Sequence, residues 1–151
     1  MDFLSEQRIL YVSNRYSPIY DHFADNYNIK PAQLFLICAS IGFRNLKKTT
    51  ISERGKEFRT TYYDTNSKKS AVYTILLSDP ELGKDIKQFA DAEYKRKAMT
   101  ALESYAEGGM DILTEEVFRS NWDGHKLDDT YKEYDVDIVN YINTSINKVP
   151  F

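Results

Sequence analysis

Apolar residues recur at steps of three and four along most of this chain, which is the spacing of helices that bury one face. The first clear case lies between Asp21 and Tyr27, and a break is expected at Asn28. Pro31 suits a first helical position, because the amide hydrogen that proline lacks would have no partner there. The following residues are apolar almost all round as far as Phe43, so this second helix is expected to be surrounded by protein.

The longest periodic stretch begins at Asp79 and Pro80, which suit the cap and the first position of a helix. Its apolar residues keep to one helix face as far as Ala106. The pair Gly108-Gly109 follows, and glycine readily adopts the left-handed conformation that ends many helices. The sequence therefore predicts one long helix with a stop at the two glycines.

Two shorter helices are expected after the glycines. Apolar residues on one side predict the first over residues 110–118, and the Asn-Trp-Asp-Gly run at 121–124 breaks it. The last helix is predicted from about Asp128. No internal repeat or low-complexity linker interrupts the chain, which favours a single helical domain over residues 1–151.

The β content is harder to place from the pattern. Residues 1–20 fit either a short helix or a strand. Residues 58–63 include β-branched and aromatic residues and favour a strand, whereas the seven residues 71–77 are too few to separate strand from helix by period. The predicted fold class is mainly α: a compact helical domain of about five helices, with room for a short β-hairpin near residues 58–77.

A composition of 42% hydrophobic and 28% charged residues is that of a globular protein rather than a disordered chain. Cys38 is the only cysteine, so it cannot form an internal disulfide and is expected to be a small buried apolar residue. With two histidines the chain offers no zinc site, and we expect neither a metal nor another cofactor. The longest apolar run is too short to cross a bilayer and no signal peptide is visible, so we expect a cytoplasmic protein without a membrane partner.

Charge is unevenly distributed, although the formal net charge is only −3. A basic segment, residues 44–69, carries eight basic and three acidic residues, a net of +5. Its basic residues are Arg44, Lys47, Lys48, Arg54, Lys56, Arg59, Lys68 and Lys69. Residues 107–137 carry ten acidic and three basic residues, a net of −7. The basic segment is a candidate surface for a phosphate backbone or for an acidic partner protein. The alternative is a solvated loop whose positive charges pair with acids elsewhere in the fold.

A search for catalytic motifs finds no glycine-rich phosphate loop and no activated serine or cysteine. A magnesium-dependent nuclease would need two or three carboxylates gathered around the ion. Seven candidate carboxylates occur late in the chain: Asp111, Glu115, Glu116, Asp128, Asp129, Asp135 and Asp137. All seven are predicted on exposed helix faces, so the sequence assigns no catalytic and no metal-binding residue.

Residues 94–113 resemble the C-terminal part of small bacterial proteins associated with DNA phosphorothioation (dnd) systems. In that family a helix with a Lys-Arg pair leads to Glu-Tyr-Ala-x-Gly-Gly and then to a hydrophobic-x-Ile-Leu segment. Lys95 and Arg96 stand for the basic pair here, and Ser104 replaces the acidic residue. The matching motif positions are Tyr105, Ala106, Gly108, Gly109, Ile112 and Leu113. Upstream, Ile41-Gly42-Phe43 resembles the end of the family's apolar helix, so the similarity spans roughly residues 30–115.

The resemblance implies a small accessory component of a bacterial anti-phage defence system, and it carries no catalytic residue. The expected function is a non-catalytic accessory subunit that binds a larger nuclease or ATPase partner, with the basic segment also touching DNA. One alternative is an independent DNA- or RNA-binding regulator that uses residues 44–69. Another is a small nuclease without a readable motif. Whether the chain forms a homo-oligomer is left open.

Overall fold

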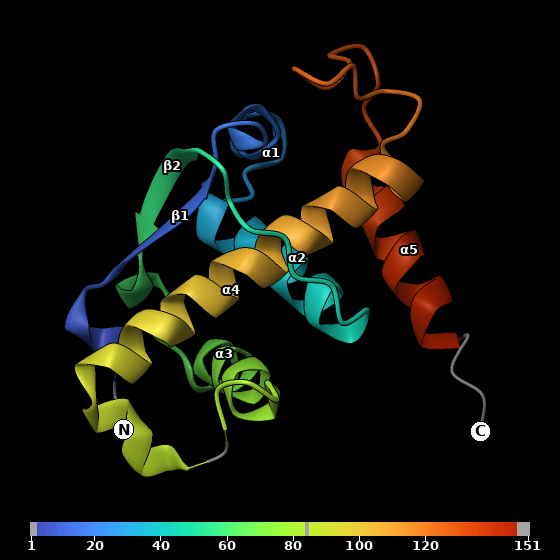
Figure 1. Ribbon diagram of the computed structural model, residues 1–151. Helices are drawn as coiled ribbons and strands as arrows, with labels where there is room; N and C mark the ends of the chain where they lie inside the picture. The colour runs from blue at the N-terminus through green and yellow to red at the C-terminus, as the bar shows by residue number, and fades with distance from the viewer. Residues whose placement is uncertain (1–2, 84, 148–151) are drawn as a thin grey trace.

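The computed structural model describes residues 3–83 and 85–147, which form five α-helices and a two-stranded antiparallel sheet (Figure 1). The predicted mainly α class with about five helices is confirmed. The helices are α1 (Ser17–Tyr27), α2 (Pro31–Arg44), α3 (Asn66–Ser78), α4 (Ala92–Ile112) and α5 (Tyr134–Asn147). The strands are β1 (Ile9–Ser13) and β2 (Arg54–Arg59), and short 3-10 helices lie at Phe3–Glu6, Thr60–Tyr62 and Ile86–Ala90.

Helix α2 lies at the centre of the fold, and its predicted start at Pro31 is confirmed. Helix α1 precedes it and ends before Asn28, whose left-handed backbone (φ 53°) makes the predicted break. The side chains of Leu34, Phe35 and Cys38 are at most 1% exposed, as expected for a helix surrounded by protein. Burial raises the pKa of the Cys38 thiol to about 12, so the thiol stays protonated and behaves as a small apolar group.

The strand expected around residue 58 is present, but its partner comes from the first 20 residues of the chain. β1 and β2 are antiparallel, with Leu10 opposite Phe58 and Ser13 opposite Arg54. Helices α1 and α2 lie in the connection between the two strands, so the sheet is not a local hairpin. Residues 71–77, for which the pattern left strand and helix open, belong to α3.

The long helix predicted from Pro80 begins twelve residues later, at Ala92. Asp79 accepts two amide hydrogen bonds from the residues that follow it (2.8 and 3.0 Å), but these close a turn instead of starting a helix. Gly83 then takes a positive φ of 80°, which a continuing right-handed helix does not allow. The helix starts only after Asp91, whose carboxylate accepts an amide hydrogen of the first turn at 3.2 Å.

The predicted stop at Gly108-Gly109 is wrong. Helix α4 passes through both glycines to Ile112, and one wider π-type turn, Leu113–Val117, continues it. The glycines lie where α4 crosses α2. A Cβ atom on Gly109 would lie only 1.8 Å from the carbonyl oxygen of Cys38, so the two backbones approach each other more closely than any side chain would allow.

Two further glycines make close backbone contacts: Gly42 at the same crossing, and Gly108 with the loop that follows α2. A Cβ atom on Gly42 would lie 2.0 Å from the carbonyl oxygen of Tyr105, and one on Gly108 would lie 2.2 Å from that of Lys47. The two regions that carry the family resemblance therefore meet in space. The other motif residues are buried in the core beside this crossing: Tyr105, Ala106, Ile112 and Leu113.

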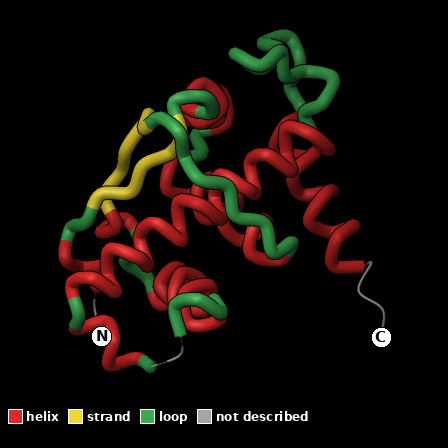
Figure 2. Tube along the Cα trace, in the orientation of Figure 1, coloured by secondary structure: helices red, strands yellow, loops and turns green. Residues whose placement is uncertain are grey.

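The loop between α2 and β2, residues 45–53, lies across α4 (Figure 2). Thr49 attaches the loop to the helix at two points. Its amide donates to the carbonyl oxygen of Ser104 at 3.0 Å, and its hydroxyl donates to the Asp111 carboxylate at 2.7 Å. The loop therefore covers part of α4 that the helical pattern alone would leave in solvent.

Helix α5 begins at Tyr134, later than the expected start near Asp128, because residues 118–133 form a loop and turns. Its first turn is held by aromatic side chains. The Tyr134 ring meets that of Phe118 edge-on at 5.4 Å, and the Phe23 ring lies 6.3 Å away. From this anchor α5 runs down beside α2 (Figure 1).

Candidate partner-binding groove

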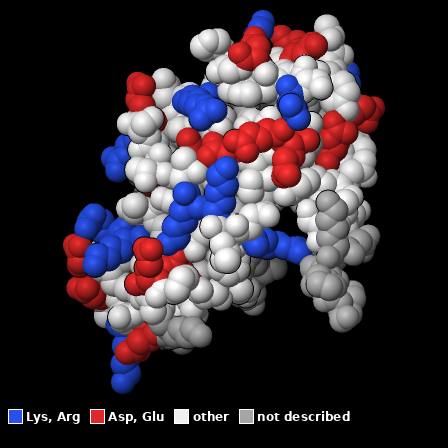
Figure 3. Space-filling model, turned by 45° about the vertical axis from the view of Figure 1, so that its right-hand side comes forward, with Lys and Arg blue, Asp and Glu red and all other residues white. Residues whose placement is uncertain are grey.

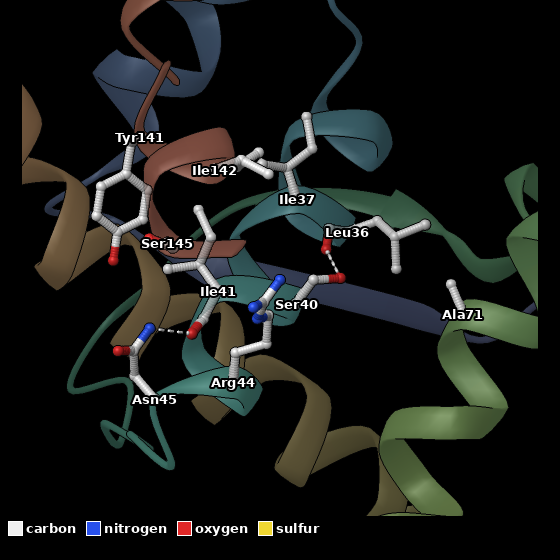
Figure 4. Close-up of a pocket in the computed structure, with 10 residues that line it drawn as sticks. All are labelled: Leu36, Ile37, Ser40, Ile41, Arg44, Asn45, Ala71, Tyr141, Ile142 and Ser145. Carbon is white, nitrogen blue, oxygen red and sulfur yellow. Dashed lines mark hydrogen bonds between the residues drawn. The ribbon is translucent and has the colours of Figure 1, made fainter. Parts of the chain in front are cut away.

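An apolar groove of about 320 Å³ lies between α2, α3 and α5 (Figure 4). We call it the α2–α5 groove. Its lining residues are Leu36, Ile37, Ser40, Ile41, Arg44, Asn45, Ala71, Tyr141, Ile142 and Ser145. Most of them present carbon to the groove, which suits an apolar occupant.

The floor of the groove is formed by α2, which carries apolar side chains not only on the face that α4 covers but also on a second face. Ile41 is 5% exposed, whereas Leu36 and Ile37, one turn earlier, are only half-buried and face the groove. Ala71 of α3 closes one side. Sequence reasoning did not select these residues, because apolar positions on a helix are assigned to the core by default.

The opposite wall is a helix that is buried mainly near its start. On α5, Tyr134 and Ile138 are 0% and 4% exposed. One turn further on, Tyr141 and Ile142 are only half-buried and line the groove. Helix α5 therefore packs closely at its N-terminal half and leaves space between its later turns and α2.

The polar groups of the groove differ in how they are satisfied. The Ser40 hydroxyl donates to the carbonyl oxygen of Leu36 at 2.8 Å, and the Asn45 side-chain amide donates to that of Ile41 at the same distance. Within the described residues, the guanidinium of Arg44 makes no ion pair, and it lies beside Ser40 at the groove (Figure 4). An occupant that is apolar along its length and carries one carboxylate would match this arrangement, because a guanidinium binds a carboxylate through two parallel hydrogen bonds.

The basic segment does not lie on one element in the structure. Its members are spread over the end of α2, the 45–53 loop, β2 and α3. Four of them pair with acids of the same chain: Lys47 with Glu115 (3.9 Å), Lys48 with Asp79 (2.7 Å), Lys56 with Asp21 (2.7 Å) and Lys68 with Asp64 (3.5 Å). Arg54 lies 4.4 Å from the ring centre of Tyr11, Arg59 lies exposed on β2, and Lys69 lies on α3. For half of the segment, the charges therefore pair within the fold.

One of these pairs is buried and joins three segments. Asp79 is 1% exposed and accepts hydrogen bonds from Lys48 (2.7 Å) and from the Tyr105 hydroxyl (2.5 Å). Burial by itself would raise the pKa of Asp79, but these hydrogen bonds and those from two backbone amides outweigh it and lower the pKa below its usual value. This cluster ties the 45–53 loop and the turn after α3 to α4.

A row of acidic residues runs along α4 under the same loop. Glu103, Glu107 and Asp111 follow each other at steps of four and therefore lie on one face of the helix. At the molecular surface, Asp and Glu side chains lie close to basic ones (Figure 3). Asp111 was expected on an exposed face but is 8% exposed, because the loop covers it and because it accepts hydrogen bonds from Thr49 and the Tyr16 hydroxyl. Burial raises the pKa of Glu107 to about 7, and the neighbouring Asp111 carboxylate acts in the same direction.

The remaining candidate carboxylates lie apart from this row. Glu115, Glu116, Asp128 and Asp129 are exposed, whereas Asp135 and Asp137 are partly buried on α5. Among residues 3–83 and 85–147, no three His, Cys, Asp or Glu side chains lie close enough together to hold a metal ion. In the same residues, every helix is too short or too polar to span a bilayer.

Comparison with family models, with curated proteins and with solved structures finds no match to this chain.

Proposed function

We propose that this protein is a non-catalytic subunit that attaches to a larger protein by taking an apolar segment of that partner into the α2–α5 groove. The observation that carries the proposal is the combination of an apolar floor with the Arg44 guanidinium, whose donors are not used by an ion pair within the described residues. The Ser40 hydroxyl and the Asn45 side-chain amide, by contrast, already donate to the backbone of α2.

A helix of the partner fits this groove better than an extended strand. The groove is bounded by helices and not by an open sheet edge, so it offers no row of backbone groups to pair with a strand. An amphipathic helix needs only apolar side chains on one face and a carboxylate placed to meet Arg44. Each well-buried aliphatic side chain then contributes about 1.5–3 kcal/mol before the costs of association.

The resemblance to small proteins of DNA phosphorothioation systems supports placing this subunit in an anti-phage defence assembly, where a larger nuclease or ATPase would be the partner. Residues of the resemblance form the crossing of α2 and α4. That crossing sets the position of α2, and thereby of the groove floor. In this proposal the shared motif acts through shape and not through a reacting group.

The proposal is tested by affinity capture from the native host with groove variants. Ile37→Asp places a charge on the half-buried floor, and Arg44→Glu reverses the charge at the groove. Arg59→Glu is the matched control, because Arg59 is an exposed arginine of β2 that is not among the groove residues. Unfolding curves establish that all three variants are folded.

The wild type and Arg59→Glu are expected to retain the same larger protein, and Ile37→Asp and Arg44→Glu to lose it. A substitution of lysine for the partner's acidic residue should then restore binding to Arg44→Glu. If both folded groove variants capture the partner as the wild type does, the groove is not the binding site and the proposal is wrong.

A further inference from the structure

A second surface, on the other side of the α2–α4 crossing, forms a continuous trough along α4. Three adjoining hollows of about 390, 150 and 450 Å³ make it up. Thr100 lines all three, Arg96 lines the first and the last, and Arg54 lines the first two. The trough shares no lining residue with the α2–α5 groove.

Positive charge dominates one half of this trough. Three cations from separate parts of the chain line the first hollow: Arg8 just before β1, Arg54 at the start of β2, and Arg96 on α4. Lys97 of α4 lines the third hollow, which Arg96 also reaches. Glu103 is the only acidic residue among those that line the first two hollows. At the other end, Lys48 is held by Asp79 and Glu81.

The four cations are available to a ligand. Arg8 pairs with Glu6 at 3.0 Å, but Lys95 also pairs with Glu6 at 2.6 Å and would keep it satisfied if Arg8 turned away. The pair of Arg96 with Glu93 lies at the surface, with both side chains more than half exposed, and such pairs hold their partners only weakly.

Arg54 lies over the Tyr11 ring, where a guanidinium keeps its hydrogen-bond donors at the ring edge. Lys97 is exposed on α4. The hydroxyl groups of Thr50 and Thr100 line the trough between the cations, whereas the Ser104 hydroxyl donates to the carbonyl oxygen of Thr100 at 2.9 Å. Figure 3 shows basic side chains with acidic neighbours gathered at the lower left of the molecule.

We infer that this trough binds the phosphate groups of a nucleic-acid strand, through Arg8, Arg54, Arg96 and Lys97. A linear depression with cations at intervals and hydroxyl donors between them suits a repeating phosphate chain better than one small anion. This assignment differs from the basic segment of the sequence. It keeps Arg54 but replaces the other seven members by cations that are distant in sequence. It is also independent of the proposed partner groove.

The test is fluorescence anisotropy of the full-length protein with a short labelled DNA, single-stranded in one arm and duplex in the other, over a range of salt concentrations. Four phosphate contacts predict a slope of log affinity against log salt of about −2.8 for a single strand, since each contact contributes about 0.7. Raising the salt from about 50 to 200 mM should therefore weaken binding about 50-fold.

The triple variant Arg8→Gln/Arg54→Gln/Arg96→Gln should reduce the single-strand slope to about −0.7. The matched control Arg119→Gln/Lys126→Gln/Lys132→Gln removes the same number of charges from exposed residues of the loop before α5, away from the trough, and should keep the wild-type slope. The pair Arg96→Gln/Lys97→Gln changes only exposed residues of α4. It should reduce the slope to about −1.4 even if the triple variant folds poorly. Equal losses in the trough and control variants would show that net charge alone matters, and absence of binding by the wild type at low salt would also overturn the inference.

Discussion

The crossing of α2 and α4 makes a quantitative prediction for Gly109→Ala. Two substitution effects compete. Alanine favours a helix over glycine by about 1 kcal/mol, so in an open helix the change would stabilise the protein. At Gly109 the new Cβ atom would lie 1.8 Å from the carbonyl oxygen of Cys38, whereas an ordinary contact needs at least 3.4 Å.

The two helices would have to separate by about 1.6 Å, the difference between these distances. Both atoms in the contact belong to backbones, so no side-chain rotation relieves it. Overpacking in a core typically costs about 1–3 kcal/mol, and a backbone clash belongs at the upper end of that range. After subtraction of the helix-propensity gain, we expect Gly109→Ala to lower the free energy of unfolding by about 2 kcal/mol, and the melting temperature by roughly 4–8 °C.

Urea unfolding followed by circular dichroism measures this difference. Lys97→Ala on the exposed face of the same helix is the control, and it should change the free energy of unfolding by less than about 0.5 kcal/mol. If Gly109→Ala is as stable as the wild type or more stable, the helices do not approach as described, and the account of the glycine motif fails.

Two further predictions concern the buried carboxylates of the same region. Asp79→Asn leaves Lys48 and the Tyr105 hydroxyl without a charged acceptor and should cost roughly 1.5–3 kcal/mol in urea unfolding at pH 7. Folding lowers the pKa of Asp79, so the ionised carboxylate stabilises the protein at pH values above the unfolded-state pKa. This stabilisation is lost as the pH falls through the folded-state pKa. The difference in free energy of unfolding between wild type and variant should therefore shrink below about pH 4. The pH dependence that Glu107 contributes has the opposite sign. Its pKa rises from 4.5 to about 7 on folding, so the free energy of unfolding should fall as the pH rises between these values. Glu107→Gln should remove that slope and be more stable than the wild type at pH 8, and an unchanged slope would contradict the assignment.

The helices that could be predicted from the sequence are those whose signals are local. Pro31 and the apolar run after it specify α2 by themselves, and the αL residue Asn28 ends α1 as expected. The prediction that the long helix starts at Pro80 was wrong because the apolar spacing continues through a turn and a 3-10 helix. The period of a 3-10 helix is close to that of an α-helix. Only the positive φ of Gly83 and the cap at Asp91 separate the segments.

Features that depend on contacts between residues far apart in the sequence could not be predicted from the apolar pattern. A glycine pair ends a helix or lets two helices touch, and only the position of Cys38 on α2 decides between these roles here. The partners of charged residues also depend on contacts between residues far apart in the sequence. Lys48 and Lys56 belong to one basic run in sequence, but their partners Asp79 and Asp21 come from other parts of the chain. The groove was missed because its apolar floor has the composition of a core.

The distance in sequence between the two sides of the crossing also affects synthesis of the protein. Cys38 leaves the ribosome 71 residues before Gly109, which at common elongation rates is about 4 to 14 seconds. During that interval α2, the most apolar of the helices that the structure describes, has no α4 to cover it. Nascent chains that stall before Gly109 should therefore be held by chaperones or removed by proteases.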